Sequence, residues 1–200
     1  QLYRLQHTFI NNFTHELKTP VTSIKIFLET FARHEIAREE QLKYIGFMLQ
    51  DVERLSNNIN SILNVARIES KVFNWEFTAG DARELVRNFV TENSHVFRNC
   101  DISIGEPPGH NCIVPLSVPL FDILLMNLIT NSIKYNNSER PRIDITFARD
   151  GKFLLIRFRD NGIGIEKDEM KHLFRKFYQG PRRGEHVPAG GSGIGLYLVQ

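Results

Sequence analysis

The chain has 200 residues, of which 42% are hydrophobic and 24% are charged. This hydrophobic content permits a packed core and argues against intrinsic disorder. Its 25 Lys and Arg residues balance 23 Asp and Glu residues to a formal charge of +2, so nothing favours nucleic acid as a partner. Cys100 and Cys112 are too few for a disulfide framework, and the apolar runs are far shorter than the roughly 18 residues of a membrane span. We expect a soluble, cytoplasmic portion of a protein.

The composition changes near residue 80. Gly46 and Pro20 are the only glycine and proline before that point, although the chain contains 13 glycines and 8 prolines. We therefore expect one domain over residues 1–70, a linker over residues 71–80 and a second domain over residues 81–200. The chain begins with Gln1 inside helical patterning, so it is expected to come from a longer protein. Membrane contact would then come only through absent upstream segments, which leaves anchoring in the inner membrane open.

Two long helices are predicted in the first domain. Apolar residues recur every three or four positions over residues 9–31 and again over residues 42–66, which is the spacing of one helical face. Two helices cannot enclose a core by themselves, so we expect a homodimer in which two hairpins form a four-helix bundle. The alternative is that these apolar stripes pack on the second domain of the same chain.

The second domain has a mixed pattern. Helices are predicted over residues 81–97 and 117–135, and a short strand over residues 102–104. Residues 142–148 and 153–159 alternate as strands do and are joined at Asp150-Gly151, a strong hairpin signal. The predicted fold class is therefore a helical hairpin followed by an α/β sandwich.

A candidate nucleophile lies on the first predicted helix, in the segment from His15 to Pro20. His15 falls on the face opposite the apolar stripe, so its imidazole is expected to point to solvent. Neutral imidazole is nucleophilic near neutral pH, and Glu16 can orient the ring and stabilise the imidazolium formed on attack. Thr19 follows one turn later, and Pro20 removes a helical hydrogen bond. Because a single exposed histidine is usually an ordinary solvated residue, the importance of His15 depends on a second site.

The second site begins on the predicted helix over residues 117–135. Asn127 and Asn131 stand one turn apart among apolar neighbours, and Lys134 and Tyr135 follow. Amide oxygens can bind Mg²⁺ or its waters, and Lys134 can meet a phosphate as a point charge. The alternative is that both amides only satisfy buried backbone groups.

Two glycine-rich segments follow. Asp160 ends a predicted strand and can accept a hydrogen bond from an exocyclic amine such as that of adenine, while Gly162 and Gly164 let the backbone approach a ligand. The segment 190–196 has the glycine content of a loop whose amides bind phosphates.

The segment between the two glycine clusters has the composition of a lid. Phe174, Phe177 and Tyr178 are followed by a flexible basic stretch that contains Arg182 and Arg183. Such a segment can close over a triphosphate. The alternative is a surface loop with core aromatics.

These five segments, in this order, resemble the sensor histidine kinases of two-component signalling. The resemblance covers nearly all 200 residues and rests on a phosphoacceptor box, an asparagine box, a first glycine box, a phenylalanine box and a second glycine box, at His15–Pro20, Asn127–Tyr135, Asp160–Gly164, Phe174–Tyr178 and Gly191–Leu196. It implies a dimeric hairpin that carries the phosphorylated histidine. It also implies that the second domain is of the ATP-binding type shared with gyrase and the ninety-kilodalton heat-shock chaperone, and that this domain is truncated here.

The resemblance also implies roles for single residues. His15 would be phosphorylated from Mg²⁺-ATP and would pass the phosphoryl group to an Asp of a response regulator receiver domain. Glu16 would act as acid/base, and Thr19 would orient water for dephosphorylation of the regulator. Asn131 would coordinate Mg²⁺, and Asp160 would read the adenine amine. The other nucleotide-binding positions would be Asn127, Lys134, Tyr135, Gly162, Gly164, Gly191, Ser192, Gly193, Gly195 and Leu196.

One departure from the family pattern concerns the lid. Gln179 stands where many members have an arginine that reaches the γ-phosphate, so Arg182 or Arg183 is expected to replace it. Two rival functions stay open: an ATPase or protein serine kinase on the same nucleotide fold, and a non-catalytic dimeric scaffold. His15-Glu16 on the hairpin argues against the first, and the intact Asn131 and Asp160 argue against the second.

Overall fold

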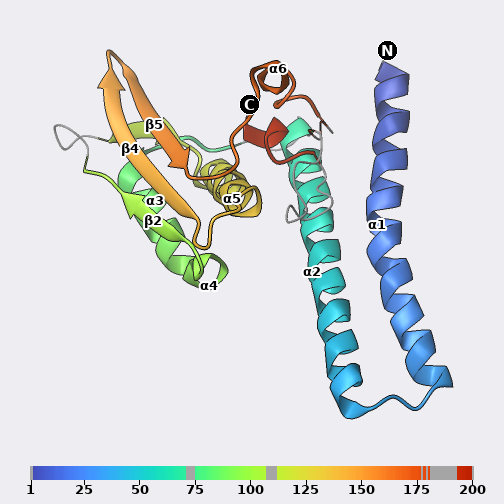
Figure 1. Ribbon diagram of the computed structural model, residues 1–200. Helices are drawn as coiled ribbons and strands as arrows, with labels where there is room; N and C mark the ends of the chain where they lie inside the picture. Colours follow the sequence, from blue (N-terminus) through green and yellow to red (C-terminus); the bar gives the residue numbers. More distant parts are fainter. Residues whose placement is uncertain are drawn as a thin grey trace.

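The computed structural model describes residues 2–70, 75–106, 112–176, 178, 180 and 193–199, with side chains from Thr14 onward. Helices α1 (Leu2–Arg33) and α2 (Arg38–Glu69) form a hairpin and lie alongside each other (Figure 1). This confirms the two predicted helices. Within the described residues, no helix combines the length and the apolar content that a membrane crossing requires.

Few side chains are buried between the two helices of the described hairpin. Phe27 stacks on Tyr44 and Phe47 with ring centroids 5.3 and 6.0 Å apart, which joins α1 to α2 near the turn. Pro20 lies inside α1, which continues past it to Arg33. Many large apolar side chains of both helices stay exposed, among them Val21, Ile26, Leu28, Leu42, Leu49, Val52, Ile59 and Leu63.

The second domain is built on two small sheets. Strand β1 (Thr78–Asp81) pairs antiparallel with β3 (Ile113–Leu116). In the three-stranded sheet of order β2-β4-β5, β2 (Asp101–Ile104) runs parallel to β4 (Arg142–Asp150), which pairs antiparallel with β5 (Phe153–Asp160). The remaining elements are helices: α3 (Ala82–Glu92), α4 (Ser94–Phe97), α5 (Val118–Lys134), α6 (Lys167–Met170) and the 3-10 turn η1 (Tyr197–Val199).

The core of this domain lies between its three-stranded sheet and its helices (Figure 1). Alternate residues of β4, Ile143 and Ile145, point inward and pack with Leu125 and Ile129 of α5. All four side chains are at most 1% exposed. The predicted α/β sandwich is therefore confirmed.

The helix predicted over residues 81–97 is present from Ala82 to Phe97, but it is divided at Asn93 into α3 and α4. Asp81 precedes α3 as its N-cap, and its carboxylate accepts hydrogen bonds from the main-chain N–H groups of Arg83 and Glu84 at 2.9 and 3.2 Å. Asn93 ends α3, because its main-chain N–H and its side-chain amide both donate to Phe89 O. Capping side chains compete with helix continuation in this way.

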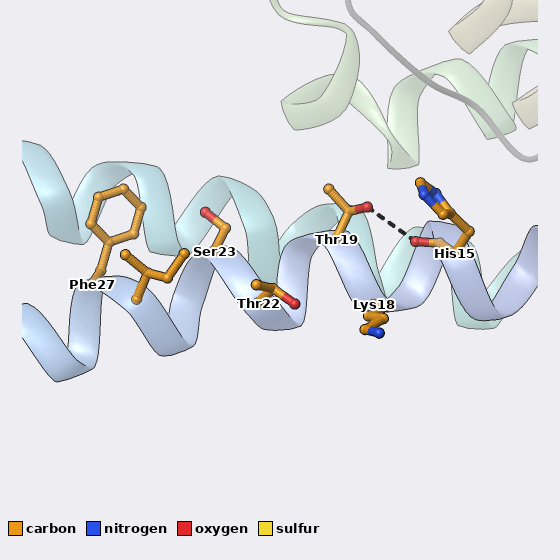
Figure 2. A pocket seen from close by; sticks show the side chains of 7 residues that line it. His15, Lys18, Thr19, Thr22, Ser23 and Phe27 are labelled. Atoms are coloured by element: carbon orange, nitrogen blue, oxygen red, sulfur yellow. Dashed lines mark hydrogen bonds between the residues drawn. The ribbon is translucent and has the colours of Figure 1, made fainter.

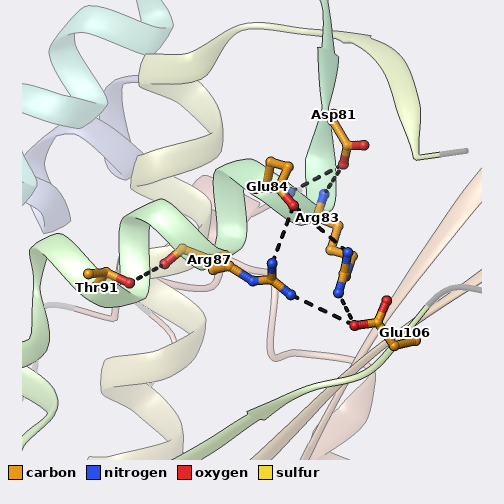
Figure 3. A network of polar contacts seen from close by, with 6 residues as sticks. All are labelled: Asp81, Arg83, Glu84, Arg87, Thr91 and Glu106. Atoms are coloured by element: carbon orange, nitrogen blue, oxygen red, sulfur yellow. Dashed lines mark hydrogen bonds and ion pairs between the residues drawn. The ribbon is translucent and has the colours of Figure 1, made fainter. Parts of the chain in front are cut away.

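A charged network holds the start of α3 (Figure 3). Arg83 and Arg87 both pair with Glu84 on the same helix and with Glu106, which follows β2. The nearby strands β1 and β3 were not predicted from the sequence. Each has only four residues, and β1 lies mostly inside the segment expected to be a linker. Such short strands form only because their partners satisfy their backbone groups.

The C-terminal end of α2 contacts the second domain. Val65 and Ile62 pack with Ile194 and Leu198. The Glu69 carboxylate is 2.6 Å from Lys176 Nζ and accepts a hydrogen bond of 2.9 Å from the Tyr197 hydroxyl. Among the described residues, the apolar stripe packs on the second domain at this end, so the alternative of packing within one chain accounts for a small part of the stripe there.

Candidate functional site

His15 lies exposed on α1 with its ring directed away from the helix (Figure 2). Thr19, one turn later, donates its hydroxyl proton to His15 O at 3.1 Å. Both residues border an open groove of about 570 Å³ along α1, whose other lining residues are Lys18, Thr22, Ser23, Ile26 and Phe27. The expected exposure of His15 is confirmed, and a partner can reach the imidazole from this groove.

The contacts of Glu16 are to α2. Its carboxylate lies 3.4 Å from Arg54 Nη2, and its main-chain oxygen accepts a hydrogen bond of 3.3 Å from Asn58 Nδ2. The Glu16 side chain is only 20% exposed. The acid/base candidate is thus held by α2, while the adjacent His15 ring is left accessible.

Asn127 and Asn131 face the glycine-rich segment near the end of the chain. A Cβ atom placed on Gly195 would lie 2.8 Å from Asn127 Oδ1 and 3.5 Å from Asn131 Nδ2, so a larger residue there would displace the Asn127 amide. Asn127 Nδ2 donates to Ile123 O at 2.7 Å. The nitrogen of the Asn127 amide therefore binds a backbone group, as the alternative expected. The oxygen of the same amide is directed at the glycine segment.

The amide pair fits a Mg²⁺ ion that is shared with a substrate. Mg²⁺ keeps several waters and uses few protein ligands when phosphates supply the rest, and amide oxygens are suitable donors. Across the described part of the chain, no group of three or more His, Cys, Asp or Glu side chains is gathered for a metal. An ion held by Asn127 and Asn131 would take its remaining ligands from water and phosphate.

Asp160 ends β5 next to α5. Its carboxylate accepts hydrogen bonds from Gly162 N at 2.8 Å and from Ser132 Oγ at 3.3 Å. A Cβ atom on Gly162 would lie 2.7 Å from Tyr135 O and 2.8 Å from Asp160 Oδ1, which excludes any larger residue. The turn thus fixes the Asp160 carboxylate at the surface, where it is exposed to a ligand.

The other nucleotide-binding candidates are distributed as follows. Lys134 Nζ lies 5.1 Å from the centre of the Tyr135 ring, at the end of α5. Gly164 and Gly193 have φ angles of 71° and 62°, in the left-handed region that favours glycine. Leu196 lies half-buried just before η1. Outside the described residues are Phe177, Gln179, Arg182, Arg183, Gly191 and Ser192.

The structure brings these candidates together in two groups. His15, Glu16 and Thr19 share α1, whereas Asp160, Gly162 and Gly195 lie beside the C-terminal half of α5, which carries Asn127 and Asn131. In Figure 1, α2 lies between α1 and α5. A reaction between the groups therefore needs domain movement or a second chain.

Sequence reasoning missed several polar residues around the two groups. Arg54 and Asn58 contact Glu16, and Ser132 contacts Asp160. Asn161 accepts from Arg142 N at 2.8 Å and thereby ties the end of β5 to the start of β4. Only Asn58 had a signal, because an asparagine on the apolar stripe of α2 needs a hydrogen-bond partner.

Two family models match separate parts of the chain. Residues 5–71 match the His Kinase A (phospho-acceptor) domain, and residues 117–200 match the histidine kinase-, DNA gyrase B- and HSP90-like ATPase family. Sensor histidine kinase RppB of Synechocystis sp. is 30% identical over all of this chain and 44% of its own length. The chain belongs to the sensor histidine kinase family. Its two domains are those of a protein-histidine kinase.

Other kinases of this family show the same relation. Sensor histidine kinase MtrB of Mycolicibacterium paratuberculosis is 26% identical over 97% of this chain and 34% of its own length. The chain thus spans less than half the length of these curated relatives.

Solved structures share the fold at lower identity. Histidine kinase AdeS of Acinetobacter baumannii has a TM-score of 0.66 at 19% identity and covers 92% of this chain and 83% of its own. Histidine kinase ThkA, solved in complex with response regulator protein TrrA, has a TM-score of 0.69 at 23% identity and covers 83% of this chain and 48% of its own.

Proposed function

We propose that this chain is the catalytic core of a sensor kinase that transfers the γ-phosphoryl group of ATP to His15 and from there to an Asp of a response regulator. The observation that carries the proposal is the exposed His15 beside a half-buried, held Glu16. It occurs in a chain whose second domain sets two asparagines against a glycine segment. The cytoplasmic side of a membrane, where ATP and receiver domains are available, is the proposed place of action.

The reaction at His15 is a direct displacement. The unprotonated ring nitrogen attacks the γ-phosphorus, the bond to the bridging oxygen breaks, and ADP leaves. The proton on the other ring nitrogen gives the product a positive charge, which the adjacent Glu16 carboxylate stabilises and from which it can accept the proton. The domains supply the rest by positioning and charge neutralisation.

Asn127 and Asn131 would hold the metal and the nucleotide phosphates beside the glycine segment. Mg²⁺, when bound there, neutralises phosphate charge. Asp160 would accept a hydrogen bond from the adenine amine, because its exposed carboxylate is fixed by Gly162 N and Ser132 Oγ. Lys134 would add a positive charge at the same end of α5.

The second copy of this chain is the proposed partner of the hairpin. The exposed apolar residues of α1 and α2 continue along both helices, and the described part of the second domain packs on this stripe near Val65. Burying such a stripe against a second hairpin completes a four-helix bundle.

The groove along α1 is the proposed docking place of the receiver domain. It runs from His15 to Phe27 and offers an apolar floor together with Lys18 and three hydroxyl side chains. A regulator seated there presents its Asp to phosphohistidine. In the reverse task, Thr19 would aim a water at the phospho-Asp, since its oxygen can still accept a hydrogen bond.

The test is His15→Gln in the full chain with ATP labelled on the γ-phosphate. We expect no acid-labile, alkali-stable label on the variant and an ATP affinity within a few-fold of the unchanged chain, because the nucleophile and the nucleotide site lie in different domains. Residual label on the variant would show that another residue accepts the phosphate. An unchanged chain that binds ATP but takes up no label would favour a scaffold.

A further inference from the structure

Helix α2 makes two contacts to Glu16, one to its main chain and one to its carboxylate. We propose that Asn58 and Arg54 are positioning residues that together fix Glu16, and through it the His15 imidazole, for phosphoryl transfer. This inference rests on the function proposed above. It adds two residues of the other helix to the machinery of α1.

The contact of Asn58 has its origin in Pro20. In an α-helix each N–H donates to the carbonyl four residues earlier, so the partner of Glu16 O would be the N–H of residue 20. Proline has no N–H, and the helix nevertheless continues to Arg33. Asn58 Nδ2 donates to this carbonyl from α2 at 3.3 Å. A side chain of one helix thus replaces the hydrogen bond that the other helix lacks.

The surroundings of this contact exclude most water. Pro20 is fully buried and Asn58 is 7% exposed, which makes Asn58 one of two buried polar or charged residues among those described. A buried polar group needs a hydrogen-bond partner. The hydrogen bond from Asn58 to Glu16 O therefore gives both groups a partner. It also fixes the position of α1 along α2 next to His15.

Arg54 stands one turn before Asn58, so both side chains leave α2 on the same face. Its Nη2 lies 3.4 Å from Glu16 Oε2, and both side chains are partly shielded from solvent. One hydrogen bond on the main chain and one ion pair on the carboxylate leave Glu16 little freedom to rotate. His15 directly precedes Glu16 in α1. A fixed Glu16 backbone therefore also limits the directions from which the His15 ring can meet the γ-phosphoryl group.

The first arm of the experiment asks whether Arg54 acts through Glu16. We compare initial rates of His15 phosphorylation for Glu16→Gln, Arg54→Gln and the double variant. Arg54→Gln is expected to lower kcat about tenfold with an unchanged KM for ATP, and Arg54→Lys to recover most of the loss. The double variant should be within twofold of Glu16→Gln alone. Losses that multiply would show an independent structural role and overturn the assignment of Arg54.

The second arm asks whether Asn58 compensates for Pro20. Asn58→Ala is expected to lower kcat several-fold in the unchanged chain. In a Pro20→Ala background, where residue 20 again has an N–H for Glu16 O, the same change should have less than a twofold effect. Equal losses in both backgrounds would overturn the proposed role of Asn58.

Two matched controls lie on the same helix. Arg38→Gln and Asn57→Ala remove an exposed guanidinium and an exposed amide, and we expect rates within twofold of the unchanged chain. ATP affinity and melting temperature are measured for every variant, so that loss of folding is separated from loss of positioning. A wild-type chain without label on His15 would overturn the proposed function itself. An active wild type with multiplying losses would overturn only this inference.

Discussion

The hairpin and the ATP-binding domain bury their apolar side chains to very different extents. In the described part of the hairpin, the buried residues are Pro20, Asn58 and Val65, whereas Leu49 is 64% exposed. In the ATP-binding domain, Leu125 and Ile145 are fully buried in a continuous cluster.

This difference separates a domain that buries its own apolar side chains from one that leaves many of them exposed. The second domain closes a core between its sheet and its helices. The hairpin would reach comparable burial only by packing its exposed apolar side chains against another apolar surface. Its candidate nucleophile, His15, is exposed to solvent. A domain of the first kind is suited to enclose a nucleotide, and one of the second kind to meet several partners.

The largest effect that tests this contrast is expected from Leu125→Ala. Removal of a fully buried leucine leaves a cavity and should lower the free energy of unfolding of the ATP-binding domain by about 2–5 kcal/mol. Leu49→Ala is the matched change on the exposed apolar face of α2. It should alter the free energy of unfolding by less than about 0.5 kcal/mol but weaken the dimer. Urea unfolding and sedimentation measure the two quantities. Equal destabilisation by both variants would contradict the contrast.

Gly162→Ala should damage every reaction that uses ATP. Its Cβ atom would lie within 3 Å of Tyr135 O and Asp160 Oδ1, so the turn that holds the Asp160 carboxylate must shift. We expect ATP affinity to fall tenfold or more, equivalent to about 1.4 kcal/mol, as measured by calorimetry.

Gly46→Ala provides the control for that change. Nothing lies within 4 Å of the added methyl group on α2, and alanine is favoured over glycine inside a helix by roughly 0.5–1 kcal/mol. ATP affinity should be unchanged and α2 slightly stabilised. Unchanged affinity in Gly162→Ala as well would remove this turn from the nucleotide site.

Thr19→Ala should instead separate two activities, because the hairpin presents its residues to different partners. In the proposed reaction autophosphorylation uses the imidazole and Glu16 but not the Thr19 hydroxyl, so most of its rate should remain. Stimulated hydrolysis of the phosphorylated regulator, which needs an oriented water, should fall about tenfold, or about 1.4 kcal/mol in barrier. Both rates are measured on one preparation with the cognate regulator. Equal losses, or a fully retained hydrolysis rate, would exclude this role.

The smallest effect is expected at the contact between the two domains. Partial burial acts to raise the pKa of Glu69, but the hydrogen bonds from Lys176 and Tyr197 and the Lys176 charge outweigh it and lower the pKa. The hydrogen bond to Glu69, together with partial burial and the carboxylate charge, raises the pKa of Tyr197.

The sign of the pH dependence follows from these directions. A lowered acid pKa gives stability at neutral pH that is lost as the pH falls through the titration of Glu69. A raised phenol pKa gives stability that is lost as the pH rises through the titration of Tyr197. Since Glu69 is 45% exposed, Glu69→Gln should cost less than about 1 kcal/mol at neutral pH. Hydrogen exchange in η1 across pH measures this, and a pH-independent contact would contradict it.

Periodicity predicted the long elements because each repeats one signal many times. α1 and α2 are 32 residues each, and α5 carries 17. The strands β1 and β3 have four residues each and were missed, because so short a segment gives no repeat. Asn93 divided a predicted helix in two through hydrogen bonds to Phe89 O that no periodicity records.

By itself the sequence indicated which side chains are candidates for the chemistry. The order of the five motifs identified the family, and the spacing of His15, Glu16 and Thr19 placed them on one helix. Only the tertiary structure decided what holds them. Arg54 and Asn58 contact Glu16 from 38 and 42 positions away in the sequence. Gly195, near the end of the chain, lies against Asn127 of α5. Such contacts depend on packing between elements distant in sequence, and local spacing carries no information about them.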